Sequence, residues 1–367
     1  MNWPLEGIQV IDLTQNVAGP YAGVILAELG AEVIKVEPPG GDATRQWGPP
    51  FWEGYGASYL ALNRNKRGIR LDLKSPDGCD QLRGLLKDAD VLLVSARPGS
   101  MEKLGLGWDA LHQEYPRLIY AEVTAFGHVG PLKDEPGYDP LMQALTGVMS
   151  VNSRPGEEPS RVGVSVIDMG CAQWIAIGVL SALRMRDETG RGHLVTGSLF
   201  ETAIAWMTYH LTSYWASGES PHGWGSGTAS IVPYQAYPTS DGWLVIAAGN
   251  NRLFQILSES LGHPEWPSDE RFSTNAARVQ HRDALNQRIA DVTKTRGGEY
   301  WQSRLKEAGI PVAKVSTVAD VAHHAELEEV GIVQSIPHPT IGQEFKSVGL
   351  PLVINGQRPE LRRVPPL

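Results

Sequence analysis

Asp168 has the surroundings in this chain that best suit covalent chemistry. It lies within residues 161–170, among apolar side chains and just ahead of a stretch that is expected to become a helix near Ala172. A carboxylate at the start of a helix lies near free backbone N–H groups, which favour its ionised form, and apolar neighbours keep it partly desolvated, as a nucleophile requires. An aspartate at such a place more often caps the helix, so both roles stay open.

The other reactive residue types give weaker signals. Cys79 and Cys171 cannot make a disulfide framework and form no Cys-x-x-Cys pair. They are best interpreted as ordinary thiols, although Cys171, one turn beyond Asp168, is the competing nucleophile. The ten histidines form no His-Glu-x-x-His motif, and no Gly-x-Ser-x-Gly elbow is present. We therefore expect no metal site and no conventional serine hydrolase.

Residues 64–74 concentrate five cations in an otherwise acidic protein. If 69–73 is a strand, alternation places Ile69, Leu71 and Leu73 on one face and the charged residues on the other. Charge runs of this kind usually form a solvated edge. The position of the run at the start of a strand also suits a ligand that carries phosphate.

The turn at residues 16–23 invites a dinucleotide-binding interpretation, with Glu37 placed where a ribose partner would lie. The Gly-x-Gly-x-x-Gly motif is absent, however, and Pro20 removes a backbone N–H group. The sequence favours a Rossmann-like scaffold that binds no nicotinamide cofactor.

Strand-like and helix-like segments alternate through the first half of the chain. We expect strands at 8–13, 32–36, 69–73, 91–94 and 118–123, and helices at 20–29, 77–87, 172–186 and 198–215. Right-handed crossovers make such strands parallel, so the pattern predicts an α/β fold with a Rossmann-like parallel sheet.

A change in the sequence pattern near Pro221, from alternating strands and helices to a glycine-rich loop, indicates a second domain. A glycine loop at 221–227 precedes expected strands at 231–237 and 243–248 and helices at 251–261, 282–293 and 299–308, and the chain from 342 to 367 reads as extended. We expect a large domain of residues 1–220, to which 331–367 return, and a smaller α+β domain of residues 221–330.

Composition limits the classes of partner. The net charge of −9 argues against nucleic-acid binding. The N-terminal residues do not read as a signal peptide, and we expect the longest apolar stretches, such as 171–183, to be too short to span a bilayer. We therefore expect a cytoplasmic protein without membrane contact.

From Leu5 to about Pro365 the chain resembles the class III CoA-transferases. The order and spacing of several short motifs carry this resemblance: Pro4-Leu5-Glu6-Gly7-Ile8, Ala18-Gly19-Pro20, residues 29–37, Gly41-Asp42-Ala43-Thr44-Arg45, Asn65-Lys66-Arg67, Arg97-Pro98-Gly99, Pro136-Gly137-Tyr138-Asp139 and Thr189-Gly190-Arg191-Gly192.

The resemblance implies a reaction and a set of site residues. It makes Asp168 the carboxylate that is acylated while CoA moves from an acyl-CoA donor to a small carboxylic acid, through aspartyl anhydride and aspartyl-CoA thioester intermediates. It implies no cofactor beyond the substrate coenzyme A. The CoA site would comprise Val17, Ala18, Leu71, Asp72, Leu73, Lys74, Ser95, Ala96, Arg97 and Lys103, and the pocket near the thioester would include Tyr138, Gly225 and Gly227.

The resemblance also implies an interlocked homodimer with the active site near its interface. Three departures from the family pattern are visible. Pro38 replaces an arginine near the nucleotide, residues 196–197 replace a common Asp-Val, and the chain ends at Leu367, where relatives usually continue into a helix.

Two other functions stay open at this stage. An α-methylacyl-CoA racemase would share the scaffold, but it would carry a His-Asp pair where this chain has Tyr138-Asp139. A non-catalytic acyl-CoA-binding paralogue would lack Asp168. The sequence does not reveal the acceptor acid.

Overall fold

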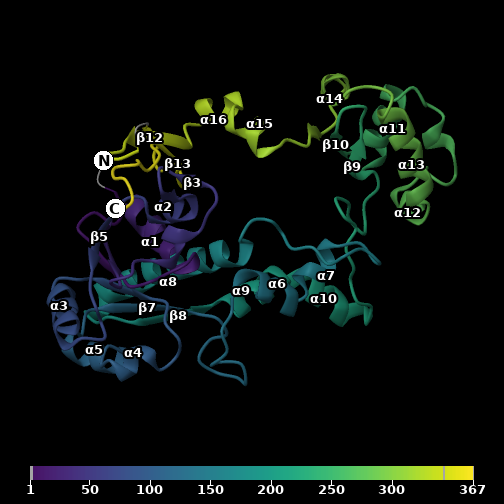
Figure 1. Ribbon diagram of the computed structural model, residues 1–367. Coiled ribbons are helices and arrows are strands. Elements are labelled where there is room, and N and C mark those ends of the chain that lie inside the picture. Colours follow the sequence, from purple (N-terminus) through teal and green to yellow (C-terminus); the bar gives the residue numbers. More distant parts are fainter. Residues whose placement is uncertain (1–2, 342–343, 367) are drawn as a thin grey trace. The chain divides into compact units, whose positions relative to one another are not determined.

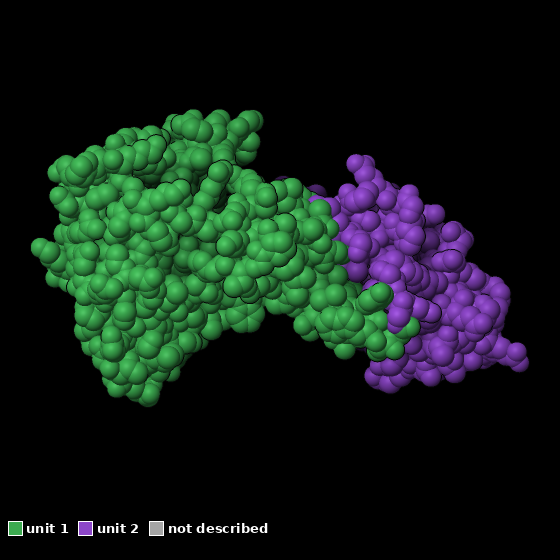
Figure 2. Space-filling model, turned by 90° about the horizontal axis from the view of Figure 1, so that it is seen from below, with its two compact units in different colours: residues 1–148, 161–217, 325–367 green, residues 149–160, 218–324 purple. Residues whose placement is uncertain are grey.

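The computed structural model describes residues 3–341 and 344–366 (Figure 1). The chain forms two compact units, coloured separately in Figure 2. Unit 1 contains residues 1–148, 161–217 and 325–367, and unit 2 contains residues 149–160 and 218–324. The short stretch 149–160, which no compositional change marks in the sequence, packs with unit 2.

A six-stranded sheet forms the centre of unit 1, and its strand order is β5-β2-β1-β6-β7-β8. Every neighbouring pair is parallel, which confirms the predicted sheet. The chain builds outward from β1 in one direction and then from β6 in the other, as in Rossmann-type folds. The strands are β1 Gln9–Asp12, β2 Glu32–Glu37, β5 Lys66–Arg70, β6 Val91–Val94, β7 Ile119–Thr124 and β8 Leu194–Ser198.

Helices cover both faces of this sheet (Figure 1). Helices α1 Ala18–Glu28, α8 Val166–Thr189 and α9 Leu199–Trp206 share one apolar core with side chains such as Val10 and Val33. The opposite core joins Ile11 and Leu92 to α3 Pro76–Leu86, α4 Ser100–Lys103 and α5 Trp108–Glu114. Strand residues alternate between the two cores because successive side chains in a strand point to opposite faces.

The remaining elements of unit 1 are short. They are η1 Ala43–Gln46, β3 Phe51–Trp52, β4 Tyr55–Gly56, α2 Ala57–Asn63, α6 Asp139–Leu145, α10 Thr208–Ser217, α16 Ala325–Glu329, β12 Val333–Pro337 and β13 Glu344–Val348, and α7 Val148–Asn152 begins at the border with unit 2.

Several predicted boundaries are wrong. The long helix begins at Val166, not near Ala172, so Asp168 lies within its first turn. The strand expected at 69–73 is β5, Lys66–Arg70, and the helix expected at 198–215 is divided into α9 and α10 at Met207. The strand was misplaced because the buried Lys66 reads as a solvated residue in the sequence.

Helix α8 also corrects the expectation about apolar length. Its 24 residues are long and apolar enough to cross a bilayer, and half of its most apolar stretch is buried inside the protein. Core helices of soluble proteins share this property, and α8 packs against α1 and the sheet.

The C-terminal stretch returns to unit 1. The side chain of Asn65 donates to the carbonyl of Glu360 and accepts hydrogen bonds from the backbone N–H groups of Arg362 and Arg363. Asn65 itself has φ +64°, a left-handed conformation that asparagine tolerates well. Gly342, where the extended segment was expected to begin, lies outside the described residues.

Unit 2 is built on an antiparallel sheet of order β11-β10-β9, with β9 Tyr234–Pro238, β10 Trp243–Ala247 and β11 Val312–Lys314. Its own core includes Tyr237, Phe254 and Trp301. The helical segments of unit 2 are α11 Asn251–Ser260, η2 Trp266–Ser268, α12 Asn275–Gln280, α13 Arg282–Thr293, α14 Gly298–Glu307 and α15 Val318–Ala322.

Candidate active site

A cavity of about 240 Å³ opens in unit 1 beyond the carboxyl ends of β1, β6 and β7. In parallel α/β sheets, ligands bind where the winding direction reverses, which here is between β1 and β6. The cavity is lined by Gln15, Asn16, Val17, Ala18, Gly19, Trp47, Ser95, Ala96, Arg97, Pro98, Val123, Thr124, Ala125, Glu135, Pro136, Gly137, Tyr138, Asp168 and Leu199.

The turn after β1 is held in place by its own polar contacts. Asp12 accepts hydrogen bonds from the backbone and the hydroxyl of Thr14, and the backbone N–H of Gln15 donates to the Ser95 hydroxyl at 3.0 Å. Asn16 takes a left-handed φ of +67°, and α1 begins two residues later. The first amides of a helix have no partner inside it, so this end of α1 suits an anionic or carbonyl ligand.

Glu37 is not available to a ribose. Its carboxylate accepts two hydrogen bonds from Arg45 and one from the Tyr59 hydroxyl. Burial raises the pKa of Glu37, but Arg45 and the other donors outweigh burial and hold the pKa at about 2. Donors inside the protein therefore already engage the Glu37 carboxylate.

Asp168 is half-buried at the cavity wall. Burial, and then the nearby carboxylate of Asp139, raise the pKa of Asp168 to about 7. The expectation that helix amides favour its ionised form is wrong, because desolvation and a like charge dominate. At neutral pH the carboxyl group of Asp168 is therefore partly protonated.

Asp139, rather than Asp168, caps helix α8. Its carboxylate accepts hydrogen bonds from the backbone N–H groups of Ile167 at 2.8 Å and Asp168 at 3.3 Å. Gln143, one turn along α6, donates to the other Asp139 oxygen at 2.6 Å. Ser165, at the N-cap position, makes no side-chain capping bond. These amides are consequently already engaged and do not face an incoming oxyanion.

Cys171 does not compete with Asp168. Its side chain is fully buried, and burial raises the pKa of the thiol to about 12. A thiol is nucleophilic as its thiolate, so Cys171 is unreactive at neutral pH.

The cavity brings together seven of the predicted site residues: Val17, Ala18, Ser95, Ala96, Arg97, Tyr138 and Asp168. Leu71 and Leu73 pack in the core below α3, and the exposed Asp72 accepts a hydrogen bond from the backbone N–H of Lys74. Lys74 and Lys103 are exposed side chains outside the cavity lining. Gly225 and Gly227 belong to unit 2, where Gly225 has φ +63°.

The basic segment 64–74 is largely internal. Arg64 pairs with Glu28 at 2.6 Å and Lys66 pairs with Asp12 at 2.8 Å, with all four side chains buried. The predictions that Arg64 and Lys66 lie on a solvated edge or bind phosphate are both wrong, because buried carboxylates already neutralise these two cations.

Besides the seven predicted residues, the cavity wall contains twelve residues that sequence reasoning did not assign to the site, among them Gln15, Asn16, Trp47, Glu135 and Leu199. Gln15 and Asn16 directly follow the β1 strand, and this position alone could have identified them. Trp47 carries no such signal, because it reaches the wall from a separate segment. Within residues 3–341 and 344–366, no three His, Cys, Asp or Glu side chains lie together as metal ligands would.

A doubly wound α/β unit with a small cavity at its switch point and a carboxylate of raised pKa has the architecture of an enzyme active site. The sequence matches the model of CoA-transferase family III over residues 5–367. The chain therefore belongs to this family and is a class III CoA-transferase.

Characterised relatives cover most of the chain. The sequence is 35% identical over 341 residues to the succinyl-CoA:glutarate CoA-transferase of Mus musculus, which covers 93% of this chain and 78% of the relative. It is 36% identical over 323 residues to the acetyl-CoA:oxalate CoA-transferase of Acetobacter aceti, covering 87% and 82%. The crystal structure of a CAIB/BAIF family protein from Brucella suis matches with a TM-score of 0.91 and 36% identity, covering 100% and 97%.

Proposed function

We propose that this enzyme moves CoA from an acyl-CoA to a small carboxylic acid through a covalent intermediate on Asp168. The observation that carries the proposal is the half-buried carboxylate of raised pKa in the cavity wall. Glu135, the other carboxylate among the lining residues, is exposed. The names of the relatives support this substrate class, since they pair a CoA thioester with a small dicarboxylic acid, glutarate or oxalate.

The first half-reaction transfers CoA to the enzyme. Ionised Asp168 attacks the thioester carbonyl, and the carbon–sulfur bond breaks. CoA departs as its thiolate, and the acyl group stays on Asp168 as an aspartyl-acyl anhydride. The thiolate then attacks the aspartyl carbonyl of this anhydride and releases the donor acid as a carboxylate. The product is an aspartyl-CoA thioester.

The second half-reaction reverses these steps with a new acid. The acceptor carboxylate attacks the aspartyl thioester and displaces CoA thiolate, which forms a second anhydride. The thiolate attacks the acceptor carbonyl, and Asp168 leaves as a carboxylate. Because one thioester replaces another, the proposal requires no ATP and no cofactor beyond coenzyme A.

Oxyanion stabilisation has to come from donors other than the first amides of α8, since Asp139 occupies those. Gln15 and Asn16 line the same cavity as Asp168, and their side-chain amides are neutral donors. We assign them this role, together with the first backbone amides of α1.

Only the reacting end of acyl-CoA fits inside the cavity. Its volume of about 240 Å³ is below the roughly 300–1,000 Å³ of pockets that enclose a whole drug-sized ligand. The nucleotide would then lie outside, where Arg97 at the cavity wall and the exposed Lys74 and Lys103 offer positive charge to its phosphates.

We further propose a homodimer, interlocked as the family resemblance implies. Large exposed apolar side chains on three helices of unit 1 support it: Leu145 on α6 (55% exposed), Trp174 and Ile177 on α8 (47% and 51%), and Trp215 on α10 (73%). Exposed apolar groups gathered on one set of helices are typical of a surface that a partner covers.

A screen of acyl-CoA donors against small mono- and dicarboxylic acids, read by mass spectrometry of the products, tests this function. We expect one new acyl-CoA for each donor consumed, without ATP, and no product from Asp168→Ala. Deuterium uptake at the α-carbon from D₂O without CoA transfer would instead identify the racemase. Binding of CoA without any product would identify the non-catalytic paralogue.

A further inference from the structure

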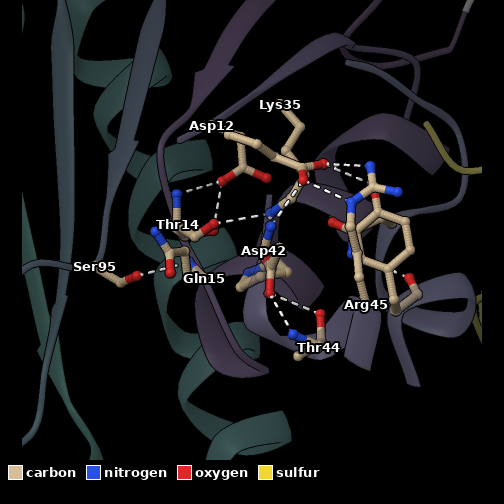
Figure 3. Close-up of polar contacts among 12 residues, drawn as sticks. Asp12, Thr14, Gln15, Lys35, Asp42, Thr44, Arg45 and Ser95 are labelled. Carbon is tan, nitrogen blue, oxygen red and sulfur yellow. Dashed lines mark hydrogen bonds and ion pairs between the residues drawn. The ribbon is translucent and has the colours of Figure 1, made fainter. Parts of the chain in front are cut away.

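Four charged side chains lie completely buried below the cavity, and the mechanism above does not use them. They are Asp12, Lys35, Asp42 and Lys66, each with a side-chain exposure of 0%. Figure 3 labels Asp12, Lys35 and Asp42. Charges are expensive to bury and persist in a fold only when they are paired. Lys66 pairs with Asp12, and Lys35 pairs with Asp42 at 2.8 Å.

Lys35 makes a second contact that Lys66 does not make. Its Nζ donates a hydrogen bond to the backbone carbonyl of Thr14 at 2.9 Å. The next residues along the chain, Gln15 to Gly19, line the cavity. The hydrogen bond from Lys35 to Thr14 therefore fixes the start of the turn that faces the substrate.

The other partner of Lys35 fixes a different stretch of the wall. Asp42 caps the short helix η1 by accepting hydrogen bonds from the backbone N–H of Thr44 at 2.9 Å and from its hydroxyl at 2.7 Å. Trp47 follows η1 directly and lines the cavity. By capping η1, Asp42 thus helps to position Trp47, just as Thr14 helps to position the turn at 15–19.

Other contacts strengthen each stretch separately. Asp12 holds Thr14, and Glu37 accepts a hydrogen bond from the backbone N–H of Asp42 at 2.8 Å. Among the described hydrogen bonds and ion pairs, Lys35 is the side chain that joins Thr14 to Asp42 (Figure 3). A cation is suited to this place, because both of its partners are acceptors.

We infer that Lys35 is a positioning residue of the acyl-CoA site: its buried ammonium ties the 15–19 turn to the Trp47 segment, so that the substrate meets a preformed wall. This inference rests on the proposed function. Lys35 lies outside the cavity and acts on the substrate through the 15–19 turn and the segment that contains Trp47. A loosened wall would weaken the fit of acyl-CoA, since small misplacements of positioning groups reduce catalytic efficiency strongly.

The test is a steady-state comparison of Lys35→Met with the wild type. We expect the KM for acyl-CoA to rise about tenfold or more, because a methionine fills the space but can neither donate a hydrogen bond to Thr14 nor pair with Asp42. A purely structural role would reduce the fraction of folded enzyme, and so the maximal rate, while leaving the KM unchanged. Arg67→Met, on the exposed side chain of the neighbouring strand β5, is the matched control and should keep the wild-type KM.

A second variant protects the test against misfolding. Lys35→Met combined with Asp42→Asn removes both charges, so no unpaired charge stays buried, and it should show the same increase in KM. An unchanged KM in either folded variant would overturn the inference. Failure of both variants to fold would also overturn it, since the pair would then serve the fold alone.

Calorimetry with coenzyme A separates this inference from the proposed function. If the wild type binds coenzyme A but transfers nothing, the proposed function fails. Weaker coenzyme A binding by Lys35→Met would still support the positioning role in that case. Equal binding by both proteins would contradict it.

Discussion

Asp168 holds its proton more tightly than an ordinary aspartate, because burial and the carboxylate of Asp139 both oppose its negative charge. Only the ionised form attacks a thioester. We therefore predict that kcat/KM for acyl-CoA rises with pH up to about 7 and is level above it, as a pH–rate profile will show.

Asp139→Asn provides the control for this profile. The amide oxygen can still accept the hydrogen bonds from the Ile167 and Asp168 amides, but the like charge is gone. The acidic limb should move to lower pH. A limb that stays in place would mean that Asp139 does not set the ionisation of Asp168.

The same raised pKa predicts a pH-dependent stability. An unfolded aspartate ionises near pH 4, whereas Asp168 in the fold ionises near 7, so stability falls as pH rises through this interval. The neutral Asp168→Asn avoids that loss. Its melting temperature should exceed that of the wild type at pH 8 by about 2–4 °C for each kcal/mol relieved, and should match it at pH 4. A lower value at pH 8 would contradict the account.

At the scale of single residues, the sequence allowed Asp168 to be identified but not its protonation. The decisive neighbour, Asp139, lies 29 positions before Asp168 in the chain and reaches the first turn of α8 only in the folded state. Local patterns cannot reveal such a contact.

At the scale of elements, burial of charge explains the main error. From the sequence, residues 64–74 were predicted to form a solvated, charged edge or a phosphate site. In the structure, Lys66 begins strand β5 and is neutralised by Asp12 inside the protein. The start of α8 was misplaced for a related reason, since its cap comes from a distant residue. Elements with ordinary apolar periodicity, such as β6 and α13, were predicted at their observed bounds.

Lys66→Met should destabilise the fold by about 3–5 kcal/mol, because Asp12 would be left as an unpaired buried charge. Urea unfolding of the two proteins measures this difference. Arg67→Met, next in the chain but exposed, should lie within about 0.5 kcal/mol of the wild type. Equal stabilities of the two variants would show that the Lys66 pair is not needed.

At the scale of the whole molecule, the alternation of strands and helices was enough to predict the parallel sheet, since strands that are joined by crossover helices run parallel in one sheet. The assignment of residues 149–160 to unit 2 could not be predicted, because it depends on packing between distant segments.

The exposed apolar side chains of α6, α8 and α10 predict a homodimer. Light scattering should give twice the 40.0 kDa mass of one chain. If the chains are interlocked, that mass should persist on dilution until the protein unfolds. A folded monomer at micromolar concentration would contradict the interlocked arrangement.

Trapping of the intermediate shows whether Asp168 becomes covalently acylated during turnover. Hydroxylamine converts an acylated aspartate into a hydroxamate, whereas an acylated cysteine returns to the thiol. After incubation with acyl-CoA and hydroxylamine, peptide mass spectrometry should locate the hydroxamate on Asp168 and find none in Asp168→Ala, while Cys171→Ser should still be labelled. A label on another residue, or transfer that persists in Asp168→Ala, would contradict the mechanism.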